Sequence, residues 1–273
     1  QGNTVTYTVT VPDALATKGI GDNVANVNTL HYEVYRTAVA ETVTFTDADR
    51  LLYHKTATVT NGTAKIELEL VNDQNFTVLF WAQVARGEGE AAIYNTEDLT
   101  NVTYAGNVLP NSSDYFSNQE DYAAFYAADF VRDSDSKSKS VKLKRPFAQL
   151  NIATENTVSH QSNSLYKVKI NDSKVVLSNV ATTFDVAQNL PAKTAVGGFS
   201  KFEFKTSDVP TTPSTLTVNG QTYEYVAMNY VFANGTTEVY YEIDATLTSE
   251  YAETTEARVT NIVPNVPLKE NYR

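Results

Sequence analysis

The feature that most constrains this chain is a repeated alternation of apolar and polar side chains with a period of two residues. The clearest case places four apolar residues at every second position, Val5, Tyr7, Val9 and Val11. Successive side chains of a β-strand point to opposite faces of a sheet, so the alternation predicts strands with one buried face. Asn-Gly pairs, prolines and polar clusters separate such stretches at intervals of roughly ten residues, which is typical of an antiparallel β-sandwich.

Composition supports an all-β chain and narrows the function classes. Among 273 residues there are 17 Tyr, 12 Phe, no Cys, and 32 acidic against 21 basic side chains, for a net charge of -11. Aromatic residues favour strands. The lack of Cys excludes disulfides, cysteine-ligated metals and thiol nucleophiles. The acidic balance argues against a nucleic-acid partner and against adsorption to an anionic membrane surface. No apolar run is long enough to cross a bilayer as a helix.

The buried face of the chain changes within residues 141–154. Apolar residues fall on odd positions at the start of this stretch and on even positions at its end. A strand that swaps its buried face carries a bulge or passes from one packing layer to another. Proline, which cannot donate to a sheet ladder, lies at the swap. The motif Arg145, Pro146 and Phe147 therefore marks the expected link between two tandem antiparallel β-sandwich domains, 1–145 and 146–273.

Every second residue of 76–84 is apolar from Phe76 onward, and Leu79 and Trp81 are apolar on the opposite face, which predicts a central strand covered on both faces. Trp81, the only tryptophan, lies in the middle of this stretch. Core packing explains Trp81 better there than a sugar-stacking platform does.

One short helix is expected after residue 117, where it would cover an open end of a sandwich. Ser117 and Glu120 fit a capping box. Aromatic residues then follow at helical spacing, Tyr122, Phe125, Tyr126 and Phe130.

Turn-forming and strand-breaking residues predict several turns and strand ends. Asn61-Gly62 and Asn219-Gly220 each predict a β-hairpin, and Asn-Gly supports the positive φ angles that both residues of a type I′ turn adopt. We also expect Asn171-Asp172 to close a strand. Pro264 and Pro267 are expected to interrupt the last strand.

No catalytic constellation stands out. The three histidines, His31, His54 and His160, form no metal-binding motif and no close pair along the sequence. There is no phosphate-binding glycine loop and no nucleophile elbow. No pair of carboxylates has a context that indicates a raised pKa. We therefore expect a non-enzymatic protein without a cofactor or metal.

Three segments carry a family resemblance. They are KRPFAQLNI at 144–152, FTVLFWAQ at 76–83 and NVPLKENYR at 265–273. In order and spacing they resemble the Bacteroidales fimbrillin-like proteins, which include fimbrial subunits and related surface lipoproteins. The resemblance implies two transthyretin-like sandwiches and a place on the bacterial cell surface, in the outer membrane or a fimbrium. It also implies adhesion to a host protein or glycan, and a membrane link only through a lipid anchor upstream of Gln1.

The resemblance further implies assembly with other fimbrial subunits, or with copies of this chain, by strand exchange. In the family's major subunits an arginine-specific protease trims the N-terminal strand, and a donor strand from the next subunit fills the emptied groove. Carried onto this chain, the removable strand is that of Val5, Tyr7, Val9 and Val11. The trimming positions would be Arg36 or Arg50. Family members continue past the NYR end with another apolar strand, so either a piece is missing after Arg273 or this member is shorter.

A second interpretation is a surface glycan-binding lipoprotein of an envelope uptake system. It requires exposed aromatic side chains that form a platform. The candidates are Tyr94, Tyr104, Tyr115 and Tyr223.

Overall fold

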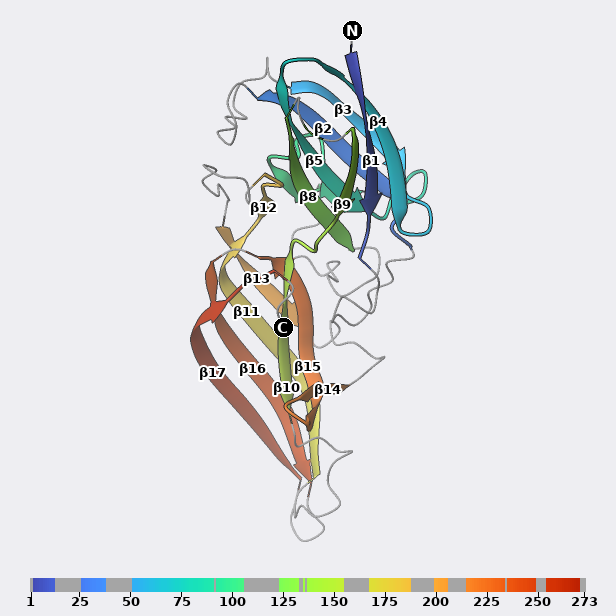
Figure 1. Ribbon diagram of the computed structural model, residues 1–273. Helices are drawn as coiled ribbons and strands as arrows, with labels where there is room; N and C mark the ends of the chain where they lie inside the picture. The colour runs from blue at the N-terminus through green and yellow to red at the C-terminus, as the bar shows by residue number, and fades with distance from the viewer. Residues whose placement is uncertain are drawn as a thin grey trace.

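The computed structural model describes most of the chain. The described residues are 2–12, 26–37, 51–90, 92–105, 123–132, 135, 137–154, 167–187, 199–205, 215–233, 235–248 and 254–270. Every regular element among them is a β-strand, numbered β1 to β17 (Figure 1). The prediction of an all-β chain built from antiparallel sheets is confirmed.

Two sheets pack face to face in the first half of the chain. Sheet A has the order β4 (Thr63–Val71), β1 (Gly2–Thr10), β9 (Ser138–Lys142). Sheet B has the order β3 (Leu51–Thr58), β2 (Thr29–Thr37), β5 (Asn75–Gln83), β8 (Ala124–Val131). All neighbours are antiparallel except β1 and β9, which run parallel. The core between the sheets includes Tyr7, Leu68 and Phe80.

Both faces of β5 are buried, as its consecutive apolar residues predict. Val78 and Phe80 belong to the core shared with sheet A, whereas Leu79 and Trp81 belong to a second core on the opposite face. Trp81 is 0% exposed, which confirms its assignment to the core.

The second half of the chain forms sheet D. Its main path is β10 (Phe147–Thr154), β15 (Gln221–Phe232), β11 (Lys167–Ala181), β16 (Thr236–Thr248) and β17 (Thr255–Pro267). Two further strands join it, β13 (Phe199–Lys205) beside β11 and β14 (Thr215–Val218) beside β15. β11 meets β15 in a single pair, Ala181 with Phe232, and β10 and β15 cross in front of β11 and β16 (Figure 1). Residues of both groups share one core, so sheet D supplies both layers of a sandwich.

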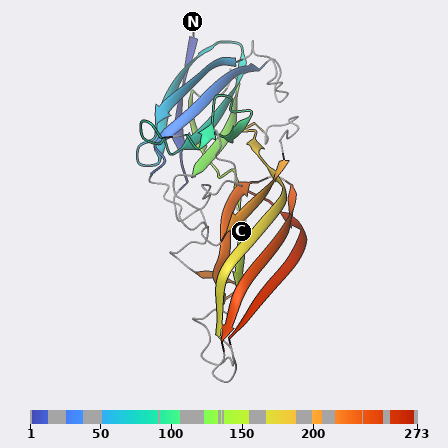
Figure 2. The same cartoon turned by 180° about the vertical axis from the view of Figure 1, so that it is seen from behind.

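The small sheet C joins the two halves. Its order is β12 (Thr183–Phe184), β7 (Val102–Tyr104), β6 (Tyr94–Asn95), so β12 of the second half pairs with β7 of the first. The second core runs through this sheet from Trp81 to Phe232. The strands of sheet D extend away from this junction when seen from behind (Figure 2). The division into domains 1–145 and 146–273 stays a prediction.

The expected change of layer within residues 141–154 is confirmed. β9 belongs to sheet A and β10 to sheet D, and Pro146 lies between them.

The expected short helix is wrong where the structure describes it. Phe125, Tyr126 and Phe130 lie on strand β8, which pairs with β5 along its whole length. The aromatic spacing is compatible with a helix, but β8 buries residues on both faces, and such a strand has no period that distinguishes it from a helix. Ser117, Glu120 and Tyr122 lie outside the described residues.

The two Asn-Gly turns have the predicted backbone but different roles. Asn61 and Gly62 have φ angles of 50° and 71°, and Asn219 and Gly220 have 52° and 81°. The second turn joins the hairpin β14–β15. The first joins β3 and β4, which lie in different sheets. Next to this turn the two chain segments are paired only by the isolated bridge between Thr60 and Thr63. The hairpin expected there is therefore wrong beyond this one bridge, and the turn is a corner between the two layers.

Two expected strand ends are wrong. β11 continues through Asn171 and Asp172, where its register with β16 shifts. β17 continues through Pro264 and ends at Pro267; it is the last strand on the main path of sheet D, and among the described strands only β16 pairs with it, so Pro264 can face the unpaired side.

Candidate functional site

The candidate site is the position of β1 within sheet A, which we call the β1 slot. β1 pairs with β4 along its whole length, from Gly2 opposite Val71 to Thr10 opposite Thr63. Its second half also pairs with β9, from Thr6 to Thr10. The second half of β1 is therefore bonded on both sides, whereas its first half is bonded to β4 alone among the described strands.

The inward face of β1 is part of the first core. Val5, Tyr7 and Val9 are 2%, 0% and 1% exposed, and Val11 beyond the strand is also buried. The ring of Tyr7 packs against Phe80 of sheet B, with 5.3 Å between ring centres. Taking β1 away would open a groove between β4 and β9, with the apolar face of sheet B as its floor.

A polar cluster holds the middle of the slot. The hydroxyl of Tyr7 donates a hydrogen bond of 2.7 Å to Oδ2 of Asp129 on β8. The same Oδ2 lies 2.7 Å from Nζ of Lys139 on β9. Lys139 also donates to the carbonyl oxygen of Phe130. Burial, followed by the negative charge of Asp129, raises the pKa of Tyr7 well above its ordinary value, so the phenol stays protonated as a donor.

The predicted trimming positions lie in different surroundings. Arg36 is an exposed residue near the end of β2, opposite Phe76 of β5 and one residue past the last pair with β3. A cut after Arg36 would separate β2 as well as β1 from the rest of the chain. Arg50 lies outside the described residues.

The predicted interdomain motif lies at the junction of the two halves. The Arg145 guanidinium is buried between two rings, 5.5 Å from Phe125 of β8 and 5.1 Å from Tyr230 of β15. The carbonyl oxygen of Pro146 accepts a hydrogen bond of 2.9 Å from the backbone N–H of Ala233. Phe147 stacks on Phe232, with ring centres 5.3 Å apart.

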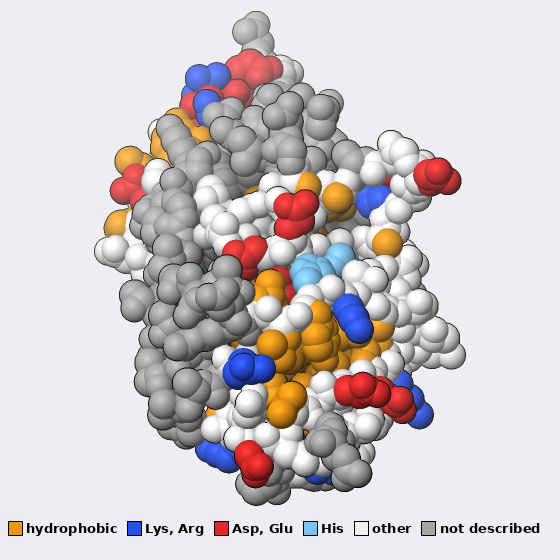
Figure 3. Space-filling view, turned by 90° about the horizontal axis from the view of Figure 1, so that it is seen from above, with side chains coloured by type: hydrophobic (Ala, Val, Ile, Leu, Met, Phe, Trp, Pro, Cys, Tyr) orange, Lys and Arg blue, Asp and Glu red, His pale blue; other side chains and the backbone are white. Residues whose placement is uncertain are grey.

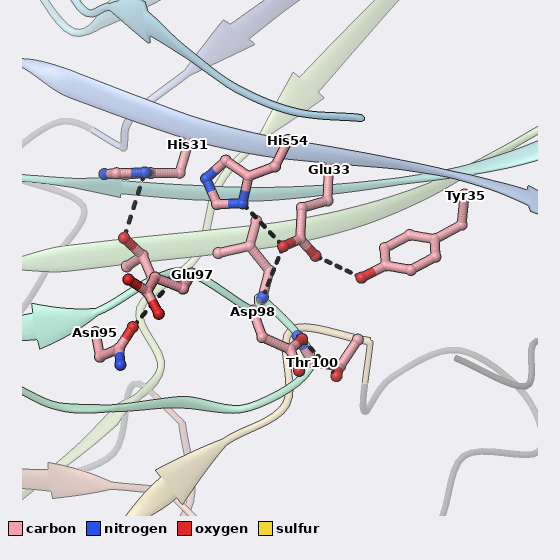
Figure 4. Close-up of polar contacts among 10 residues, drawn as sticks. His31, Glu33, Tyr35, His54, Asn95, Glu97, Asp98 and Thr100 are labelled. Atoms are coloured by element: carbon pink, nitrogen blue, oxygen red, sulfur yellow. Dashed lines mark hydrogen bonds and ion pairs between the residues drawn. The ribbon is translucent and has the colours of Figure 1, made fainter. Parts of the chain in front are cut away.

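Sequence reasoning missed a buried acidic centre on sheet B (Figure 4). The carboxylate of Glu33 is 0% exposed and accepts hydrogen bonds from the Tyr35 hydroxyl at 2.7 Å and the Leu99 backbone N–H at 3.2 Å. Nδ1 of His54 lies 3.0 Å from the same carboxylate. These contacts tie the segment that contains Leu99 to strands β2 and β3.

The histidines His31 and His54 are close in space, although they are far apart in sequence. Their ring centres are 5.8 Å apart, and Nδ1 of His31 lies 3.3 Å from the hydroxyl of Thr96. Histidine atoms reach the surface beside acidic and apolar side chains (Figure 3). The signal that was missed is the run His31, Glu33, Tyr35, whose period of two places all three on one face of a strand.

Electrostatics in this centre follow from burial. Desolvation raises the pKa of Glu33, and its hydrogen bonds to Tyr35, Leu99 and His54 partly oppose the rise. Burial, and then the charge of His54, lowers the pKa of His31 to about 4. Within the described ranges, no group of three or more His, Asp or Glu residues is placed to hold a metal ion.

The tyrosines of the glycan-platform interpretation do not form an exposed surface together. Tyr94 and Tyr104 are only 3% and 6% exposed and pack in the second core, so both are wrong as platform residues. Tyr223 is partly buried, and Tyr115 lies outside the described residues. None of the described residues belongs to a helix that is long and apolar enough to cross a membrane.

Several solved structures are similar to this chain at low identity. A proposed cell adhesion protein from Bacteroides eggerthii is 12% identical, with a TM-score of 0.47, and the match covers 98% of this chain and 84% of that one. A proposed adhesin from Bacteroides ovatus is 8% identical, with a TM-score of 0.46 and coverage of 95% and 83%. The fimbrial anchor protein Mfa2 from Porphyromonas gingivalis is 12% identical, with a TM-score of 0.39 and coverage of 90% and 78%.

No match to this sequence was found among curated proteins. One family model does match, over residues 1–273, and its description is a family of unknown function, DUF6562. The chain therefore belongs to the DUF6562 family.

Proposed function

We propose that this protein is a non-enzymatic fimbrial subunit, or a fimbria-associated surface lipoprotein, that assembles by exchange of β1 and serves in adhesion. The observation that carries the proposal is the position of β1 between β4 and β9. The resemblance of three sequence segments to fimbrillin-like proteins supplies the biological setting. On that basis its place is the bacterial cell surface, in the outer membrane or a fimbrium.

The slot suits strand exchange for a physical reason. A strand added to a sheet gains main-chain hydrogen bonds, and pockets for alternate side chains give selectivity. At an ordinary sheet edge only one side of the added strand is bonded. In the β1 slot an incoming strand would bond to β4 and to β9, and it would bury three side chains, as Val5, Tyr7 and Val9 do now.

The protein's partners follow from this mechanism. They are other fimbrial subunits or further copies of this chain, and a host protein or glycan as the target of adhesion. The glycan-binding alternative has less support, because two of its four tyrosines are core residues.

The test is oligomer size by light scattering before and after digestion with an arginine-specific protease. We expect cleavage near Arg36 or Arg50, which leaves β1 and β2 joined in one fragment, to let β1 leave the slot and to yield heat-resistant oligomers. Arg36→Lys and Arg50→Lys variants keep the charge but remove each cleavage site, so they identify the position that matters. A digested protein that loses β1 and stays monomeric would exclude assembly by strand exchange.

A further inference from the structure

The β1 slot contains a hydrogen-bonded polar cluster among its apolar side chains. Tyr7 is 0% exposed, yet its hydroxyl reaches across from sheet A to Asp129 of sheet B. Asp129 in turn pairs with Lys139, which stands opposite Tyr7 on β9. Three strands of two sheets therefore meet at one hydrogen-bonded cluster in the middle of the slot.

This cluster distinguishes one register from all others. A slip of one residue would turn the threonines of β1 inward and every apolar side chain outward. A slip of two residues would keep the alternation but place Val5 or Val9 at the position of Tyr7. Valine has no hydrogen-bond donor in its side chain, so Asp129 would lose its phenol partner, and the space beside Phe80 would be underfilled.

Val5 and Val9 cannot make that distinction by themselves. Both occupy apolar surroundings, and a neighbouring valine, isoleucine or leucine of similar size would fit with a small loss. The hydroxyl of Tyr7 is different, because it gives the partly buried carboxylate of Asp129 a donor that valine, isoleucine or leucine cannot supply. The selective position of the slot is therefore its central one.

We infer that the slot selects its occupant through this phenol. The occupant is an extended strand, antiparallel to β4, with apolar side chains at alternate positions and a tyrosine at the place of Tyr7. This inference rests on the proposed strand exchange and adds the chemistry of the strand that is accepted. The first strand of a second copy of this chain has that chemistry.

The test uses the full chain with a protease recognition sequence inserted between Pro12 and Asn26, in the connection from β1 to β2. After cleavage, β1 is held only by its non-covalent contacts and can be replaced. Fluorescent peptides of residues 2–12 are added in excess, and bound peptide is measured by anisotropy after gel filtration. The peptides are the native sequence, Tyr7→Phe and the control Thr4→Val, which removes a hydroxyl from an exposed position.

We expect the native and Thr4→Val peptides to bind alike and the Tyr7→Phe peptide to bind about tenfold more weakly, because it lacks only the buried donor. In a chain with Asp129→Ala, the preference for tyrosine over phenylalanine should disappear. If that variant does not fold, the three peptides on the unaltered chain decide the question.

The two proposals fail in different ways. Equal binding of the native and Tyr7→Phe peptides would overturn the selection by the phenol and leave strand exchange intact. Binding of neither peptide to a cut chain that keeps its β-sheet circular dichroism would overturn strand exchange, and the selection with it.

Discussion

Nδ1 of His54 lies 3.0 Å from Oε1 of Glu33, a carboxylate with no exposed surface. Glu33 also accepts hydrogen bonds from Tyr35 and from the backbone of Leu99, so it joins two strands of sheet B to the segment that contains Leu99. A buried carboxylate is tolerated only where such partners compensate for its lost hydration.

Replacement of Glu33 by alanine is therefore expected to destabilise the protein by roughly 3 kcal/mol or more, because at least two buried donors lose their acceptor. Glu33→Gln keeps an acceptor oxygen and should cost less. Unfolding in urea, followed by circular dichroism, measures both. Equal losses for the two variants would mean that volume, and not hydrogen bonding, is what Glu33 contributes.

Stability should fall as the pH is lowered from about 6.5 to about 4. The pKa of His31 is lowered from 6.5 to about 4 in the folded protein. Between these pH values His31 is protonated in the unfolded chain but neutral in the folded protein, so lowering the pH favours unfolding. The raised pKa of Glu33 acts in the opposite direction, since protonation of Glu33 favours the folded state. Melting temperatures from pH 4 to pH 8 test the sign.

The control for this pH dependence is His31→Asn, which cannot titrate. We expect its melting temperature to change less than that of the native protein over the same range. If both proteins show the same slope, another group causes the acid sensitivity.

The junction of the two halves should depend on Arg145. Its guanidinium lies between the rings of Phe125 and Tyr230, and each cation–π contact at a buried site contributes about 1 kcal/mol or more. Arg145→Ala is thus expected to lose about 2 kcal/mol of stability and to become more sensitive to limited proteolysis. Arg258→Ala, at an exposed arginine paired with Asp244, is the matched control and should change little.

The fluorescence of Trp81 should report on the interior of the protein. Trp81 is the only tryptophan, it is 0% exposed, and its indole N–H donates to Gln83 at 2.8 Å. We expect weak quenching by iodide in the folded state and a shift of the emission to longer wavelength on unfolding. Strong quenching in the native protein, or a change of emission on addition of soluble glycans, would contradict this placement.

Much of the fold was predictable because period-two patterns and turn residues act locally. The alternation around Tyr7 specified β1, and the Asn61-Gly62 pair specified a tight turn. Sheet membership was not predictable in the same way. Nothing near Asn61 shows that β3 and β4 separate into different sheets, since that depends on which distant strands each one pairs with.

The errors have the same origin. Tyr126 sits among aromatic residues at helical spacing, and only its pairing opposite Trp81 makes this segment a strand. The contacts of Glu33 could not be predicted from the sequence, because His54 comes from another strand and Leu99 from a separate segment. The alternation of His31 and Glu33 placed both on one face, but the pattern did not show that this face is covered.

β9 has two roles that connect the slot to the rest of the molecule. It pairs with β1 and with no other strand described in sheet A, and it leads within five residues into the stacked side chains of Arg145 and Phe147. An empty slot would leave β9 without its ladder, and the connector to the second half would lose its support on that side. In the assembly proposed above, a row of subunits would be stiff only where each slot is filled, so its bending rigidity would depend on how many slots are occupied.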